Sequence, residues 1–239
     1  MTHHKDGLQI GGAYYGRNIL GSSNPAGRHD LGVQVHDESA VAVVVQLGAP
    51  ATLDADGVVD GAYTTATAGG SFTLNGALVS TSVATFDVPR AVSITATADN
   101  SSVTFTISGT DKYGEALSED IVGPTGTVNG QKAFLTVSGA SSDLATTTAG
   151  DAINIGTADI LGLPYLLDDL GKCAGHTENG LSVTGGTLVV GVTTAATATK
   201  GDTRGTIDPQ TTMNGSTYVT LTMIVDASAK ETLYGVDQA

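Results

Sequence analysis

Four carboxylate side chains, Asp111, Glu115, Glu119 and Asp120, lie within the twelve residues GTDKYGEALSED at positions 109–120. Glycoside hydrolysis requires two positioned carboxyl groups, and Ca²⁺ prefers several carboxylate oxygens, so this stretch could do chemistry. Glu115 and Glu119 stand four residues apart. On a β-strand this spacing is about 13 Å, beyond the roughly 5–9.5 Å between glycosidase carboxyl groups. The spacing therefore argues against catalysis.

The local pattern indicates a hairpin turn instead. The alternating run VTFTIS precedes Asp111, and a second alternating run follows Gly114. In a D-x-x-G turn the aspartate accepts backbone N–H hydrogen bonds and the glycine supplies a positive φ. On the following strand we expect Glu115, Leu117 and Glu119 to share one face, and we take the strand to be exposed.

A second acidic stretch, LDADGVVDG, matches part of a calcium loop. It carries Asp54, Asp56 and Asp60, but Gly57 lies at the fourth position of the loop and the loop has no glutamate at its end. A calcium loop has its glycine at the sixth position and a glutamate at the twelfth. A hairpin turn with Asp-Gly at its corner is the alternative, and the pattern favours that turn.

Histidine and cysteine do not complete a zinc site. Cys173 and His176 form C-x-x-H, which supplies two of the four ligands of tetrahedral zinc, and the chain has no second cysteine. The sequence also lacks a G-x-S-x-G nucleophile motif and a glycine-rich nucleotide loop. We therefore expect no enzyme activity, no metal and no cofactor.

The composition is typical of an all-β protein. Of 239 residues, 40% are hydrophobic, 32 are glycine, 5% are aromatic and none is tryptophan. The chain is also rich in Thr and Val, which favour pleated strands, while Gly favours turns. This length can form one large β domain or two small ones with a hydrophobic core.

Charge and apolar patterning limit the partners and the compartment. The 24 acidic and 10 basic side chains give a net charge of −14, which opposes contact with a phosphate backbone, so no nucleic-acid partner is expected. The longest apolar run, AVAVVVQLG, is far shorter than the roughly 20 residues of a membrane span. A single cysteine forms no internal disulfide and fits synthesis in a reducing cytoplasm. We expect a soluble protein without a membrane partner.

Strand patterns recur roughly every ten to twelve residues, as in an antiparallel sandwich or barrel. We expect strands at 41–47, on both sides of the Asn75-Gly76 turn, and at 91–97, 103–108, 116–122, 133–137, 152–155, 187–192 and 217–225. The continuous apolar run at 41–47 predicts a strand buried on both faces. The runs at 91–97 and 103–108, joined by ADNSS, predict an antiparallel hairpin. One short helix is expected in DASAKETLYG, capped by Asp226 or Ser228 and ended by Gly235.

The sequence suggests three regions. Residues 1–37 are glycine-rich and aperiodic yet contain apolar side chains, which favours an extended arm that docks on a partner. A β domain is expected at 38–157 and a second β region at 158–239, possibly packed on the first. Residues 158–172 form an apolar crossover between them, because Pro164 denies this segment a ladder hydrogen bond.

Apolar residues in segments without periodicity are candidates for subunit contacts. In the arm these are Tyr14, Tyr15, Ile19 and Leu20, and in the crossover they are Leu163, Pro164 and Tyr165. The alternative is that these side chains cap the ends of the β core.

From residue 86 to residue 239 the chain resembles virion structural proteins of tailed bacteriophages, most closely head decoration (cement) proteins. The motifs that carry the resemblance are GTDKYGE, GLPY, GDTRGT and the closing LYGVDQA. The resemblance implies a β-rich homotrimer that binds the major capsid protein on the outer surface of the capsid and stabilises the shell. A charge of −14 fits a position outside the capsid, away from packaged DNA.

Two other classes remain open. One is a tail or baseplate β protein of the same kind of virus, and the other is a carbohydrate-binding adhesive module. Sugar-binding modules usually display exposed Trp or Tyr rings, so the absence of tryptophan makes the second class the weaker alternative.

Overall fold

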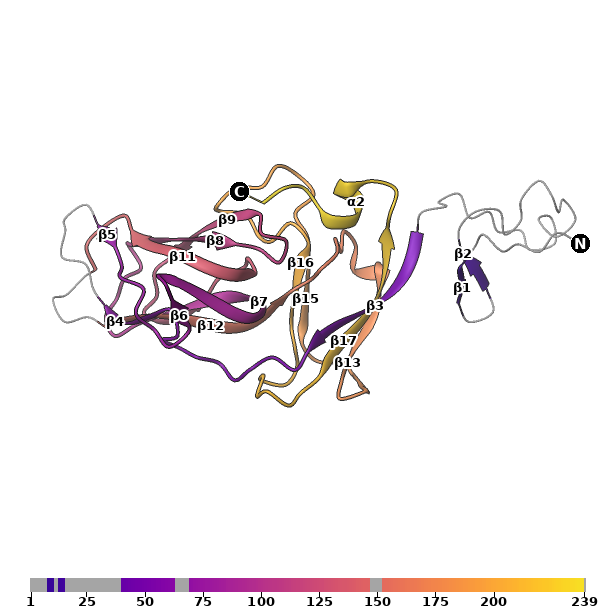
Figure 1. The fold of residues 1–239 in the computed structure, drawn as a ribbon, viewed down its shortest axis with the longest axis horizontal. Coiled ribbons are helices and arrows are strands. Elements are labelled where there is room, and N and C mark those ends of the chain that lie inside the picture. Colours follow the sequence, from indigo (N-terminus) through magenta and orange to yellow (C-terminus); the bar gives the residue numbers. More distant parts are fainter. Residues whose placement is uncertain (1–7, 11–12, 16–39, 63–68, 147–151, 239) are drawn as a thin grey trace, which may run out of the picture.

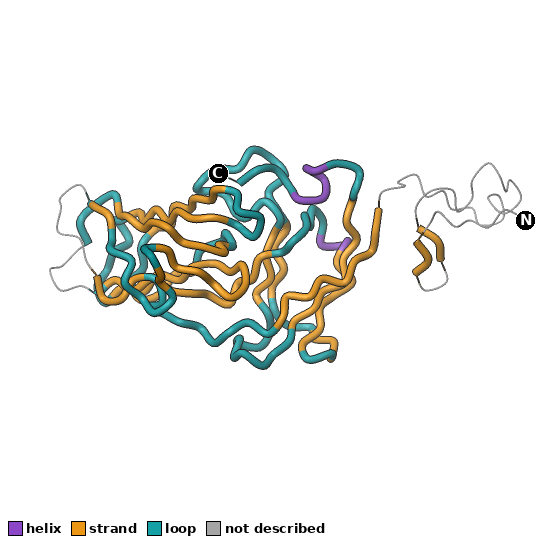
Figure 2. Tube along the Cα trace, in the orientation of Figure 1, coloured by secondary structure: helices purple, strands orange, loops and turns teal. Residues whose placement is uncertain are grey.

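The computed structural model describes residues 8–10, 13–15, 40–62, 69–146 and 152–238. The fold is mostly antiparallel β with one short α-helix near the C-terminus, as the sequence predicts (Figures 1 and 2). Strands β1 (Leu8–Ile10) and β2 (Ala13–Tyr15) pair only with each other, and the other strands form two larger sheets.

The large sheet curls into a half-barrel around the long strand β7, Val83–Ala96. Its main path runs β15 (Thr187–Val190), β16 (Gly205–Asp208), β12 (Ile153–Gly162), β7, β11 (Phe134–Ser142), β8 (Thr104–Thr110) and β9 (Ala116–Val122). Four shorter strands pair beside this path: β4 (Val59–Ala62), β5 (Gly70–Ser71), β6 (Val79–Ser80) and β10 (Gly126–Asn129).

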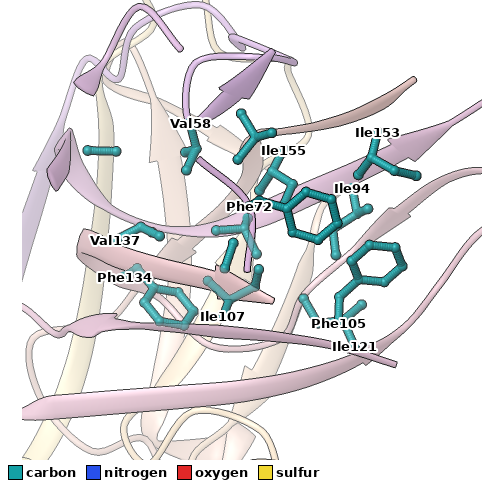
Figure 3. Close-up of a cluster of buried hydrophobic side chains, with 14 of the residues drawn as sticks. Val58, Phe72, Ile94, Phe105, Ile107, Ile121, Phe134, Val137, Ile153 and Ile155 are labelled. Atoms are coloured by element: carbon teal, nitrogen blue, oxygen red, sulfur yellow. The ribbon is translucent and has the colours of Figure 1, made fainter. Parts of the chain in front are cut away.

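Strand β7 curls the sheet because its two halves pair with different strands. Residues 83–85 pair with β6 and β11, residues 92–96 pair with β10 and β12, and Arg90 between them pairs with both β11 and β12. Pro89 has no N–H to donate, so it stands where one set of ladder hydrogen bonds gives way to the other. The sheet thereby encloses a core that includes Val58, Phe72, Ile94, Phe105, Ile107, Ile121, Phe134, Val137, Ile153 and Ile155 (Figure 3).

The predicted hairpin between residues 91–97 and 103–108 is wrong. Both segments are strands, but β11 lies between β7 and β8 in the sheet. The polar connection at 97–103 therefore joins strands that are two positions apart in the sheet. The run around Asn75 also differs from the prediction, because the backbone N–H groups of Asn75 and Gly76 both donate to the carbonyl of Val58 and leave only short strands on either side.

The second sheet has four strands in the order β14 (Leu181–Val183), β13 (Cys173–Glu178), β17 (Val219–Asp226) and β3 (Ala40–Gly48). It covers a second hydrophobic cluster that includes Val45, Leu161, Leu163, Leu167, Ile207, Met213, Val219, Leu221, Met223 and Val225. This core is made of residues from distant parts of the chain, because β3 pairs along its length with β17.

The two sheets do not follow the sequence ranges 38–157 and 158–239. Strand β3 belongs to the first range but pairs with β17 of the second. Strand β12 crosses the expected boundary, since Ile153 and Ile155 lie in the first core and Leu161 in the second. The crossover expected at 158–172 begins inside β12 and ends in the short 3-10 helix η1, Leu170–Lys172.

Strand β3 is not buried on both faces, contrary to the expectation from its apolar run. It lies at the edge of the four-stranded sheet, and Val44 is 66% exposed while Val45 is buried. A continuous apolar run is typical of a central strand in a sheet covered on both faces, but here the described residues cover only one face of this sheet.

Helix α2, Lys230–Tyr234, ends at Gly235 as expected, with φ of 80° at that glycine. It begins later than predicted, because Ala229 is its N-cap residue and Asp226 instead accepts a hydrogen bond from the N–H of Ser228. Neither helix in the described part of the chain is long and apolar enough to cross a membrane.

Candidate functional site

The four motifs GTDKYGE, GLPY, GDTRGT and LYGVDQA lie far apart in the sequence but meet around the side chain of Arg204. Arg204 is only 3% exposed. Its Nη2 lies 2.9 Å from Oδ2 of Asp111, and its Nε donates to the carbonyl oxygen of Leu163 at 3.2 Å. The guanidinium carbon also lies 5.2 Å from the centre of the Tyr113 ring, within the range of a cation–π contact.

Asp202 joins the same cluster from the GDTRGT motif. Its Oδ1 accepts a hydrogen bond from the N–H of Arg204 at 2.8 Å, and its Oδ2 accepts one from the N–H of Ala133 at 3.1 Å. The side-chain amide of Gln238, from the closing motif, donates to the same Oδ2 at 3.4 Å. Burial raises the pKa of the Asp202 carboxyl, and the charge of Arg204 acts in the opposite direction.

The turn between β8 and β9 has the predicted D-x-x-G geometry. Oδ1 of Asp111 accepts hydrogen bonds from the N–H groups of Tyr113 and Glu115 at 2.8 and 2.9 Å. Gly114 has a φ of 80°, in the left-handed region that favours glycine. The buried Asp111 thus shapes the turn with one oxygen and pairs with Arg204 through the other.

Three tyrosine rings surround the cluster. The hydroxyl of Tyr113 donates to the carbonyl oxygen of Pro164 at 2.6 Å. The rings of Tyr113 and Tyr234 meet edge to face at 5.2 Å, and those of Tyr234 and Tyr165 lie 5.9 Å apart. Burial raises the pKa of Tyr113 to about 12, so its hydroxyl remains a neutral donor at physiological pH.

The C-terminal segment closes over this cluster. Lys230 lies 3.3 Å from Glu115 and 2.6 Å from Asp237, and the N–H of Leu166 donates to the carbonyl of Leu233 at 2.9 Å. An open pocket of about 370 Å³ remains, lined by Tyr113, Glu115, Arg204, Lys230, Tyr234 and Gly235. Because Arg204 and Lys230 are already paired with carboxylates, the arrangement is suited to holding loops and tail in place.

Glu119 is buried, contrary to the expectation that its strand is exposed. It is 4% exposed and shares the inner face of β9 with Leu117 and Ile121. Its carboxylate oxygens accept hydrogen bonds from the N–H groups of Gln131 at 2.5 Å and Lys132 at 3.3 Å. Burial raises the pKa of Glu119 from 4.5 to about 7, while these two N–H groups and the Lys132 charge lower it.

The buried Glu119 holds the connection between β10 and β11 through these hydrogen bonds, and both of its oxygens are engaged by backbone N–H groups. Its partner in the discarded catalytic interpretation, Glu115, has a partly exposed side chain and contacts Lys230 at the surface. The structure therefore does not bring the two carboxylates to one reaction centre.

The second acidic stretch, around Asp54, forms a turn against β12. The N–H of Asp54 donates to Oγ1 of Thr157 at 2.9 Å, and the N–H of Thr157 donates back to the carbonyl of Asp54 at 2.8 Å. Asp54 also accepts a 3.4 Å hydrogen bond from the N–H of Asp56. No group of three or more His, Cys, Asp or Glu side chains with metal-binding geometry occurs among the described residues.

Cys173 and His176 both lie on β13, but they do not form a pair. His176 Nε2 lies 3.6 Å from Oε1 of Glu178, a buried carboxylate that also accepts the N–H groups of Gln210 and Thr211. The sulfur of Cys173 lies 3.7 Å from the carbonyl oxygen of Gly175. His3, His4, His29 and His36 lie outside the described residues.

The predicted contact residues fall into two groups. Leu163 and Pro164 are buried within the chain and Tyr165 is half-buried beside Tyr234, so these three residues contribute to the core and to the ionic cluster. In the arm, Tyr14 and Tyr15 belong to β2, where their backbones pair with Gln9 and Leu8. Ile19 and Leu20 lie outside the described residues.

A surface that the sequence did not single out is the outer face of β3 and β17, made of Ala42, Val44, Gln46, Thr220, Thr222 and Ile224. Antiparallel partners share a face of the sheet, and the opposite residues of these strands, such as Val45 and Leu221, are buried. None of these six side chains is charged, although the chain has a net charge of −14, and the acidic Asp226 lies at the end of the same face beside Ala40. We call this surface the uncharged face.

The uncharged face ends at an open strand edge. Strand β3 pairs with β17 on one side only, and no other described residue is hydrogen-bonded to its backbone. Its residues, AVAVVVQLG, include no charge and no proline. Proteins commonly protect edge strands with lysine, proline or bulges that prevent pairing with other chains, and β3 lacks the first two. An edge strand of this composition is a template on which another strand can pair.

Comparison of the chain with protein-family models, with curated proteins and with solved structures gave no match.

Proposed function

We propose that this protein is a virion structural protein that binds the outside of an assembled bacteriophage capsid and stabilises it. The observation that carries the proposal is the open edge of β3 beside the uncharged face. These features offer the outer edge of a nine-residue strand, to which no described residue is paired, and an aliphatic and hydroxyl surface on a chain whose net charge is −14. Such a surface favours contact with protein through main-chain hydrogen bonds and packing.

The ionic cluster around Arg204 supports the same role. It ties the β8–β9 turn, the 163–167 loop, the 201–204 loop and the C-terminal segment into one body. A protein that holds other subunits together benefits from such a body, because flexible loops would lose conformational entropy on binding. The resemblance of these same motifs to decoration proteins is the second support for the proposal.

The proposed mechanism is mass action. A decoration protein stabilises a shell because it binds the assembled form more tightly than the dissociated subunits, and multivalent attachment strengthens weak individual contacts. In this proposal the arm at 1–37, with Tyr14 and Tyr15, reaches the major capsid protein. The β body supplies contacts between copies.

The test is addition of the purified chain to particles that lack it, followed by measurement of bound protein and of the temperature at which the shells open. We expect saturable binding and a higher opening temperature. A variant without residues 1–37 retains β3, which begins at Ala40, and is expected to remain folded but to bind weakly.

The full chain failing to bind any head while binding purified tails or baseplates would overturn the capsid assignment in favour of the tail alternative. A truncated chain that binds capsids as tightly as the full chain would remove the arm from the mechanism. Circular dichroism of both proteins is the control for folding.

A further inference from the structure

We propose that the open edge of β3 pairs antiparallel with β3 of a second copy of this chain, which joins two four-stranded sheets into one continuous sheet. The inference deepens the proposed function by naming the partner of this edge. It can be tested on the purified protein alone, so its failure and the failure of capsid binding are separate results.

The first support is the accessibility of the strand. β3 is nine residues long and lies at the end of the sheet order β14-β13-β17-β3. Strands β1 and β2, the described part of the arm, form a separate sheet and do not pair with β3. A long, apolar edge strand without protecting charges is a ready template for pairing with another strand.

The second support is charge. Two copies of a chain with a net charge of −14 repel each other wherever their acidic surfaces meet. The six residues of the uncharged face and β3 itself carry no Asp or Glu, and Asp226 lies one strand away from the edge at the end of the face, so two copies can approach here without directly opposed acidic side chains. A second copy of the chain, which carries the same negative charge, can therefore bind at this edge with little repulsion.

The third support is self-complementarity. A twofold contact requires each strand to be its own partner, so the residue at its centre faces the same residue of the other copy. Full overlap of Ala40–Gly48 with its copy places Val44 at that centre. Val44 is 66% exposed, far more than Val45 beside it, and both Val44 side chains would lie on the uncharged face. Aliphatic pairs across antiparallel strands stabilise a sheet.

The first test is the mass of the purified full chain by sedimentation equilibrium across a wide concentration range. We expect twice the chain mass of 23.9 kDa. Val44→Lys places two ammonium groups opposite each other at the centre of the contact and is expected to raise the dimer Kd by roughly tenfold or more. Thr222→Lys adds the same charge on the same face, one strand farther from the edge, and is the matched control that retains the dimer.

The second test is a symmetric crosslink. In a Cys173→Ser background, Val44→Cys brings two cysteines to facing positions about 5 Å apart between Cα atoms, which a disulfide can bridge. Thr222→Cys in the same background is the control, because three strand spacings, roughly 14 Å, separate it from its counterpart. We expect a covalent dimer on oxidation of the first variant and none of the second.

Several outcomes would overturn the inference. A monomer at every concentration would show that the edge is covered within one chain or stays open, and a trimer would restore the stoichiometry that the resemblance implies. A dimer that survives Val44→Lys and forms no Val44→Cys crosslink would use another surface. A dimer that is lost on deletion of residues 1–37 but not with Val44→Lys would be held by the arm.

Discussion

Replacing Glu119 with glutamine should change the pH dependence of folding. Glu119 has a pKa raised from 4.5 to about 7 by burial, so the folded chain holds its proton more tightly than the unfolded chain. The stabilisation from the protonated form is complete below pH 4.5 and is lost as the pH rises through 7. The full loss is roughly 3 kcal/mol, because each pKa unit corresponds to about 1.4 kcal/mol.

Between pH 5 and pH 8.5 the wild-type chain should lose roughly 2–3 kcal/mol of unfolding free energy from this group. Glutamine does not ionise, but it keeps one of the two acceptor oxygens that receive the N–H groups of Gln131 and Lys132, which costs about 1 kcal/mol. The Glu119→Gln variant should therefore be about 1 kcal/mol less stable than wild type at pH 5 and about 1–2 kcal/mol more stable at pH 8.5.

The assay is urea unfolding of both proteins at the two pH values, with the difference between them as the readout. That difference removes the contributions of other titrating groups such as Glu178, whose pKa is lowered. The matched control is Glu115→Gln, directly before the same strand β9 and at a partly exposed side chain, whose difference from wild type should stay within about 0.5 kcal/mol at both pH values. A Glu119→Gln difference that does not change with pH would refute the reasoning.

Three further predictions concern the ionic cluster, the turns and metals. Arg204→Met should lower the unfolding free energy by about 3–5 kcal/mol, because it removes the ion-pair partner of buried Asp111 and the positive charge near buried Asp202. Urea unfolding checks this, and a loss below about 1 kcal/mol would contradict it. Gly235→Val should lower the melting temperature more than Gly114→Val. Both glycines have a φ of 80°, but only at Gly235 would a Cβ meet a neighbouring backbone carbonyl oxygen, so equal losses would contradict the packing argument. EDTA should leave the melting temperature unchanged, and a fall of several degrees would restore the calcium interpretation of the turn at Asp54.

Local features of the fold were predictable from the sequence. The turn from Asp111 to Gly114 was predictable because its geometry depends on its own residues, a short polar segment between two alternating runs. Most strands were predictable for the same reason, because the alternation of apolar and polar residues is also a local pattern. The pairing partners of the strands could not be predicted in this way. Strand β11, from a later part of the chain, lies between β7 and β8, and no local sequence pattern indicates that position.

The burial of Glu119 had a signal that the sequence interpretation did not use. Leu117 and Ile121 stand two residues on either side of it, so all three share one face, and two large aliphatic neighbours favour the inner face. The Arg204 cluster had a weaker signal. Its motifs were distinctive one by one, but their meeting depends on contacts such as Arg204 with Asp111, which lie far apart in the sequence.

The pairing of β3 with β17 also has a consequence for synthesis of the chain. Val45 and its partner Leu221 are about 175 residues apart, so the first strand of the body has no partner until nearly the whole chain has left the ribosome. At a translation rate of about 5–20 residues per second, AVAVVVQLG waits roughly 10–35 s, either unpaired or held by a chaperone. Nascent chains on neighbouring ribosomes expose the same segment during that interval. Expression at lower temperature or with holdase chaperones should therefore raise the soluble yield more than it does for a β protein whose first strand pairs with its second.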